Sequence, residues 1–242
     1  MTGERQKKQH KQAVSQGRLL ARPLQPTGVA PIGLSPLGLS QGRDGLLYVP
    51  TGYKPDRPAP LILMLHGAGG KANHSLAPLL DLANALGLIL LAPDSRHQTW
   101  DVLYGEYGSD IDFIDQALAQ TFSRYAIDPA NIAVAGFSDG ASYALSIGII
   151  NGELFNHIIA FSPGFIAPTQ QQGWPQLFVS HGTRDRVLSI DRCSRKIVPV
   201  LQQAGYEVVY REFEGGHTMP SEIVREALDW LIGKPDSEDF IP

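Results

Sequence analysis

Short apolar runs and amphipathic segments alternate along most of the chain. From residue 60 onward the apolar runs contain few polar positions, which is typical of parallel strands buried on both faces. These runs are 61–65, 88–92, 132–135, 158–161, 177–179 and 207–213. Between them apolar residues recur at helical spacing, as in Ile111, Ile114, Leu118 and Phe122. This alternation predicts an α/β fold in which helices cover both faces of a mainly parallel sheet.

Polar residues, proline and glycine mark the expected ends of three helices. Ser109 stands where a side-chain cap would begin the helix over 109–122. Ser189 is placed to begin another helix, which Gly205 ends. Pro220 suits the first turn of the last helix, and Gly233 suits its end.

The N-terminal segment differs from the rest of the chain in charge and composition. Residues 1–22 carry a net charge of +5, whereas the whole chain carries −4. We expect residues 1–22 to form a flexible basic segment and residues 23–242 to form a single domain. Residues 22–60 contain eight prolines and six glycines, which predicts irregular chain with one strand near 46–49. The acidic body argues against nucleic-acid binding.

Composition excludes several other classes of protein. With 43% hydrophobic and 18% charged residues, the chain has the composition of a globular protein rather than a disordered one. Its longest apolar stretch, 86–93, is too short to span a bilayer. The single cysteine, Cys193, allows neither an intrachain disulfide nor a zinc site built from cysteines. No apolar signal region follows the basic start, so we expect a cytoplasmic protein. The oligomeric state is left open.

The most informative motif follows the apolar run 132–135. Residues 136–140 read Gly-Phe-Ser-Asp-Gly, and an apolar segment follows them. This G-x-S-x-G pattern places a nucleophilic serine on a sharp turn between a strand and a helix, where only glycine fits two positions away on either side. The pattern alone is weakly specific, but its position between a strand and a helix favours Ser138 as a nucleophile.

Two later loops provide partners for such a serine. A serine hydroxyl needs a histidine base, which a carboxylate orients. Asp185 and His217 follow successive apolar runs, in the order Ser, acid, His expected on a doubly covered sheet. Asp191 is the alternative acid. We interpret His181, which precedes the acid, as a residue that braces its loop.

A serine nucleophile also requires donors for the developing oxyanion. The backbone N–H of Asp139, directly after the nucleophile, is one candidate. The Gly-rich loop 66–70, which follows the first buried run, offers the second, and Ala68 is our candidate there.

Three aromatic residues lie in loops that follow predicted strands. They are Trp100, Tyr104 and Phe165. We expect them to line a substrate pocket, although aromatic residues in such loops also cover core edges.

Taken together, these motifs resemble the α/β-hydrolase superfamily. More closely, they are similar to the small serine esterases of the phospholipase/carboxylesterase and polyhydroxybutyrate-depolymerase-like groups. The resemblance spans about residues 46–232 and rests on the sequences HGAGG, AGFSDGASYAL, SHGTRD and GGHTMP. It implies an α/β-hydrolase fold, hydrolysis of carboxylic esters through an acyl-serine, and no metal or organic cofactor. Ser138, Asp185 and His217 match the family's catalytic triad.

Two features depart from related groups. Secreted depolymerases usually carry disulfides and signal peptides, and this sequence shows neither. We therefore do not expect extracellular polymer degradation. Dienelactone hydrolases have cysteine where this chain has Ser138.

The expected function is therefore hydrolysis of small short-chain esters. We expect the protein to have neither a membrane span nor a large lid domain. Lysophospholipids, feruloyl esters and polyesters are alternative substrates for the same residues. A non-catalytic binding protein and a peptidase remain further alternatives, and the ordered triad argues against the first of these.

Overall fold

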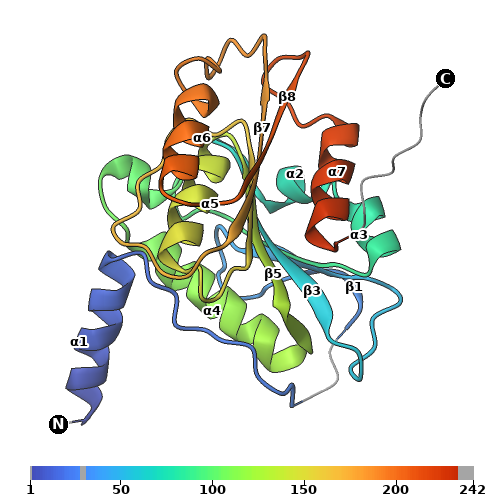
Figure 1. The fold of residues 1–242 in the computed structure, drawn as a ribbon. Coiled ribbons are helices and arrows are strands. Elements are labelled where there is room, and N and C mark those ends of the chain that lie inside the picture. The colour runs from blue at the N-terminus through green and yellow to red at the C-terminus, as the bar shows by residue number, and fades with distance from the viewer. Residues whose placement is uncertain (1, 28–30, 234–242) are drawn as a thin grey trace.

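The computed structural model describes residues 2–27 and 31–233 (Figure 1). Within these ranges eight strands form one sheet in the order β1-β2-β4-β3-β5-β6-β7-β8. The strands are β1 (Gly33–Pro36), β2 (Gly45–Val49), β3 (Ala59–Leu65), β4 (Ile89–Pro93), β5 (Ile127–Phe137), β6 (His157–Phe161), β7 (Gln176–Gly182) and β8 (Val208–Phe213). β1 and β2 are antiparallel to their neighbours, and all pairs from β4 through β8 are parallel. The mainly parallel sheet predicted from the apolar runs is confirmed.

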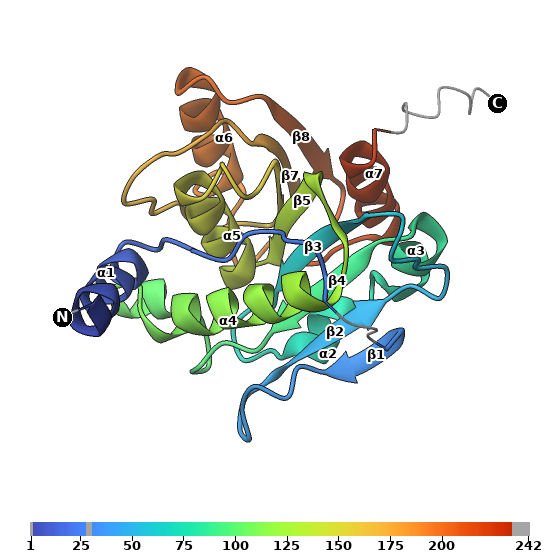
Figure 2. The same ribbon diagram turned by 90° about the horizontal axis from the view of Figure 1, so that it is seen from below.

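Helices cover both faces of this sheet, as Figures 1 and 2 show. They are α1 (Thr2–Ser15), α2 (Ala72–Leu76), α3 (Leu80–Leu86), η1 (Asp101–Tyr104), α4 (Ser109–Arg124), α5 (Asp139–Ile150), α6 (Ser194–Gln203) and α7 (Ser221–Leu231). The helices α4, α5 and α6 pack on one face, and α2, α3 and α7 pack on the other. No helix in the described ranges is long and apolar enough to cross a membrane.

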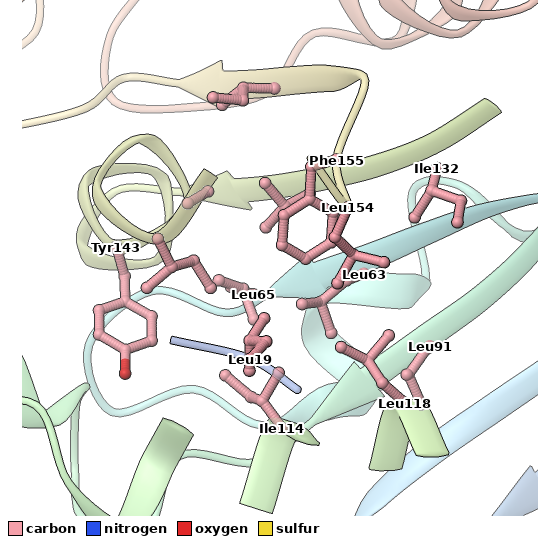
Figure 3. Packing of buried hydrophobic residues seen from close by; sticks show 14 of the residues in the cluster. Leu19, Leu63, Leu65, Leu91, Ile114, Leu118, Ile132, Tyr143, Leu154 and Phe155 are labelled. Carbon is pink, nitrogen blue, oxygen red and sulfur yellow. The ribbon is translucent and has the colours of Figure 1, made fainter. Parts of the chain in front are cut away.

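Alternation along the central strand explains the two layers of the core. In β3, Leu61, Leu63 and Leu65 join the core beneath α4 and α5, whereas Ile62 and Met64 join the opposite core. Successive side chains of a strand point to opposite faces, so an uninterrupted apolar run fills both layers. Figure 3 shows part of the first core, where β3 meets α4 and α5.

Two helix starts differ from the predicted ones. Ser109 is the first residue of α4, and Gly108 precedes it without a side-chain cap. Helix α6 begins at Ser194, five residues after Ser189, and between them the chain forms turns in which the N–H groups of Arg192 and Cys193 donate to Ser189 O at 3.0 Å. The last helix follows Pro220 as expected.

The basic N-terminal segment is helical over Thr2–Ser15, and the residues after it lie on the body. Leu19 is fully buried, and its N–H donates to the side chain of Asn151 at 2.9 Å. Arg18 donates to the carbonyl of Ile150 at 2.8 Å. The packed body therefore begins within the segment that we expected to be flexible.

Candidate active site

Ser138 lies at the tight turn between β5 and α5. Its backbone has φ 57° and ψ −121°, a left-handed conformation that costs a non-glycine residue free energy. Its N–H donates to Phe161 O at 2.9 Å, which ties the turn to the end of β6. Only 9% of the residue is exposed, so the turn is packed on most sides.

The two glycines of the motif are required by contacts between backbones. A Cβ on Gly136 would lie 2.2 Å from the carbonyl oxygen of Gly140. A Cβ on Gly140 would lie 2.2 Å from the carbonyl oxygen of Leu65, at the end of β3. Because no side-chain rotation relieves a clash with backbone, the G-x-S-x-G turn presses α5 directly against the strand that leads into loop 66–70.

Asp185 follows β7 and accepts hydrogen bonds at both carboxylate oxygens. Oδ1 accepts from the N–H groups of Val187 at 2.8 Å and Leu188 at 2.9 Å. Oδ2 lies 2.6 Å from His217 Nδ1 and 3.2 Å from His181 Nε2. Burial opposes ionisation of Asp185, but the hydrogen bonds from His217, Leu188 and Val187 outweigh it and lower the pKa below 3.8. The carboxylate is therefore charged at neutral pH.

His217 lies in the loop after β8 and connects Asp185 to the serine turn. Its Nδ1 donates to Asp185, because a carboxylate can only accept. Its ring centroid lies 4.7 Å from that of Phe137, the residue directly before Ser138. The structure thus brings together the three elements that carry Ser138, Asp185 and His217.

The competing residues have other partners. His181 is fully buried, and its ring lies 2.7 Å from Ser194 Oγ and 2.8 Å from Leu188 O. These contacts hold the loop that carries Asp185, as a bracing residue would. Asp191 pairs with Arg195 at 2.7 Å on the surface.

Loop 66–70 lies against the serine turn. A Cβ on Gly67 would stand 3.3 Å from Ser138 Cβ, so the two segments are in contact. Within the described part of the chain, neither the Ala68 N–H nor the Asp139 N–H donates to another group. Asp139 begins α5, where the first N–H groups of a helix have no partner inside the helix. Both candidate oxyanion donors are therefore unpaired, on two segments that meet at Ser138.

The three predicted pocket aromatics have different surroundings. Trp100 is fully buried, stacks on Tyr143 with centroids 5.1 Å apart, and donates from Nε1 to His66 O at 2.9 Å. The prediction that Trp100 lines a substrate pocket is therefore corrected, because its ring packs inside the fold behind loop 66–70. Tyr104 is 62% exposed and lines an open cavity of about 340 Å³. Phe165 is half-buried after β6.

A second cavity, of about 180 Å³, directly adjoins the serine turn. Ala68, His74, Phe137 and Met219 are among the residues that line it. Sequence reasoning did not identify this cavity, although Phe137 and Met219 flank the predicted nucleophile and base closely in sequence.

The described residues contain no group of three or more His, Cys, Asp and Glu side chains placed to hold a metal ion. Cys193 is buried directly before α6.

Comparison with known proteins places the chain in a family. The model of the phospholipase/carboxylesterase family matches residues 106–232, just over half of the chain. The chain belongs to this family. The matched span contains Ser138, Asp185 and His217 and begins after loop 66–70.

A curated relative and two solved structures extend the comparison. Feruloyl esterase C of Emericella nidulans is 30% identical over 158 residues, a match that covers 62% of this chain and 57% of the relative. The match thus spans little more than half the length of that protein. The crystal structure of esterase PE8 superposes with a TM-score of 0.64 at 22% identity, covering 83% of this chain and 99% of that one.

The second solved structure is a CE1 ferulic acid esterase from Anaeromyces mucronatus in complex with ferulic acid. It gives a TM-score of 0.60 at 17% identity and covers 85% of this chain and 92% of that chain. At these identities the two structures support the fold alone, and it is the α/β-hydrolase fold.

Proposed function

We propose that this member of the phospholipase/carboxylesterase family is a serine carboxylesterase. The observation that carries the proposal is the Asp185–His217 hydrogen bond of 2.6 Å, with the His217 ring packed on Phe137 of the strained serine turn. A binding module has no need for a charged acid, an oriented histidine and a serine in this arrangement.

The proposed mechanism has two half-reactions. His217 Nε2 takes the proton of the Ser138 hydroxyl while the oxygen attacks the ester carbonyl. The protonated histidine then gives this proton to the departing alcohol, which leaves an acyl-serine. Water, deprotonated by His217, hydrolyses the acyl-serine and restores the enzyme. Asp185 keeps the histidine hydrogen on Nδ1 and stabilises the imidazolium.

The negative oxygen of each tetrahedral intermediate needs fixed donors. We assign the backbone N–H groups of Ala68 and Asp139 to this oxyanion hole, because both are unpaired in the described chain and belong to the two segments that meet at Ser138. Removal of one such donor elsewhere costs about 10²–10³-fold in kcat.

Short acyl esters are the substrates that the cavity beside the serine favours. Its volume of about 180 Å³ holds a small acyl or alcohol group. In the described chain no helix lies between Phe161 and Gln176, so this connection builds no helical lid there. Each methylene contributes about 0.8 kcal/mol of binding only while it finds buried surface. The specificity constant should therefore rise over the first few carbons and then fall.

Aromatic esters are the second candidate substrate, and the similarity to a feruloyl esterase favours them. The relative described above is a feruloyl esterase, and this similarity supports a hydroxycinnamoyl ester as a substrate of this chain. Tyr104 and Phe165 remain proposed substrate contacts. A cytoplasmic location also remains a prediction, tested by cell fractionation.

One panel of substrates tests these proposals. Para-nitrophenyl acetate, butyrate and palmitate and methyl ferulate are compared by kcat/KM, with Ser138→Ala as the control. We expect acetate or butyrate to exceed palmitate, with activity lost in Ser138→Ala. Preference for methyl ferulate would select the second candidate. A maximum at palmitate, or hydrolysis that survives in Ser138→Ala, would contradict the proposal.

A further inference from the structure

A side chain from a distant part of the sequence holds loop 66–70. Arg43 lies between β1 and β2, and its Nη2 donates to the carbonyl oxygen of Gly70 at 2.8 Å. The same nitrogen lies 3.3 Å from His66 Nε2. The Nε of Arg43 donates to the carbonyl oxygen of Ser95, which follows β4. One guanidinium thus bonds both ends of the loop and fixes them to a neighbouring strand end.

These contacts also select one tautomer of His66. Its Nδ1 lies 2.7 Å from Gly67 O, an acceptor, so Nδ1 carries the hydrogen. Its Nε2 accepts from Ser95 N–H at 3.0 Å and from Arg43. Burial lowers the pKa of His66, and the charge of Arg43 lowers it further, although its bond to Gly67 and the carboxylate of Asp94 oppose this. His66 is therefore a neutral ring held between a fixed donor and a fixed acceptor.

The orientation of one peptide plane follows from this arrangement. Gly67 O accepts from His66 Nδ1 and from the N–H of Gly70 at 3.0 Å. A peptide unit is planar and trans, so its C=O and its N–H point in opposite directions. The N–H in the same plane as Gly67 C=O belongs to Ala68. Holding this carbonyl therefore fixes the direction of the Ala68 N–H.

We propose that Arg43 is a positioning residue for the oxyanion hole. Through His66 and Gly70 it locks the Gly67–Ala68 peptide, so that the Ala68 N–H is presented beside Ser138 before substrate arrives. The inference rests on the proposed esterase function. Arg43 does not touch the reacting atoms, and its effect is expected on the transition state rather than on substrate binding.

Kinetics of arginine variants test this role. Arg43→Ala removes all the contacts, Arg43→Lys keeps the charge but cannot bond several acceptors in one plane, and Arg18→Ala is the matched control. Arg18 is another partly buried arginine that donates to a backbone carbonyl, but this carbonyl belongs to Ile150 and not to loop 66–70. The readouts are kcat and KM for para-nitrophenyl acetate and the affinity of a trifluoromethyl ketone, whose serine adduct carries an oxyanion.

The expected result separates positioning from a merely structural role. In Arg43→Ala we expect kcat to fall about 10–100-fold, less than the loss of a direct donor, with KM within about threefold. Affinity for the trifluoromethyl ketone should fall in proportion to kcat/KM, and added guanidinium should restore part of kcat. Arg43→Lys should lie between the wild type and Arg43→Ala, and Arg18→Ala should match the wild type.

The remaining outcomes are distinguishable. A wild-type enzyme that does not hydrolyse the ester or bind the ketone would contradict the proposed function itself. An active wild type whose Arg43→Ala keeps kcat and ketone affinity within about twofold would overturn the inference. If Arg43→Ala does not fold, wild-type ketone affinity and kcat in Arg43→Lys would overturn it instead.

Discussion

Replacing Asp185 with asparagine removes the negative charge from the carboxylate and preserves the shape of the side chain. Three donors hydrogen-bond the native carboxylate: the N–H groups of Val187 and Leu188 at Oδ1 and His217 Nδ1 at Oδ2. An asparagine has one oxygen and one NH₂ group, so either orientation turns a donor toward donors. The variant must therefore break hydrogen bonds at one side of the group.

The structure indicates which of these hydrogen bonds the variant loses. If the NH₂ group faced Val187 and Leu188, two backbone N–H groups would lose their acceptor, at about 1–3 kcal/mol each. If it faces His217, the imidazole can move its hydrogen from Nδ1 to Nε2. The second orientation costs less, and it leaves Nε2 unable to accept the proton of Ser138. We therefore expect kcat to fall about 10²–10⁴-fold, or about 2.7–5.4 kcal/mol in the barrier.

Steady-state hydrolysis of para-nitrophenyl acetate measures this loss, with urea unfolding to show that the variant is folded. Asp191→Asn is the matched control, because its exposed pair with Arg195 should contribute little and leave kcat within about twofold. A folded Asp185→Asn whose kcat is within about threefold of the wild-type value would refute the assignment of the acid. A large loss of kcat in Asp191→Asn would refute it as well.

Three further results are expected. Gly140→Ala would place Cβ 2.2 Å from Leu65 O, so it should lower the free energy of unfolding by about 1–3 kcal/mol and reduce kcat. Gly52→Ala is the control, because Gly52 has open space around it and the substitution should change neither quantity. Urea unfolding and ester assays measure the two effects. Neither EDTA nor iodoacetamide should abolish activity, because Cys193 is buried and the proposed mechanism uses only side chains and backbone N–H groups. Loss of activity in EDTA that a divalent ion restores would contradict this expectation. Because the pKa of Asp185 is lowered in the fold, its ionised form stabilises the protein above its unfolded pKa, and the wild type should lose this advantage over Asp185→Asn as pH falls below 3.8 in acid-unfolding titrations.

The parts of the fold that sequence reasoning could predict depend on local patterns. Uninterrupted apolar runs predicted the inner parallel strands, because burial on both faces leaves no position for polar residues. Ser138, Asp185 and His217 could be proposed because each lies in a short motif at the end of such a run. Their triad roles remain proposals until they are measured, but the fold brings the elements that carry them together.

Other parts depend on packing between distant segments. Trp100 lies in a loop by sequence, yet its ring is buried because Tyr143 and the carbonyl of His66 meet it from two other elements. Arg43 lies in a segment rich in proline and glycine, where no local pattern distinguishes it from a solvated arginine. The burial of Leu19 similarly depends on Asn151, more than a hundred residues away.

We propose that Ser138 is an activated nucleophile, and covalent labelling is the most direct test of this role. The protein is treated with a fluorophosphonate, its intact mass is measured, and the modified peptide is sequenced by mass spectrometry. We expect one phosphonyl group per chain on Ser138, no addition to Ser138→Ala, and much slower addition to Asp185→Asn. Absence of labelling in the folded wild type, or labelling at another residue, would contradict it.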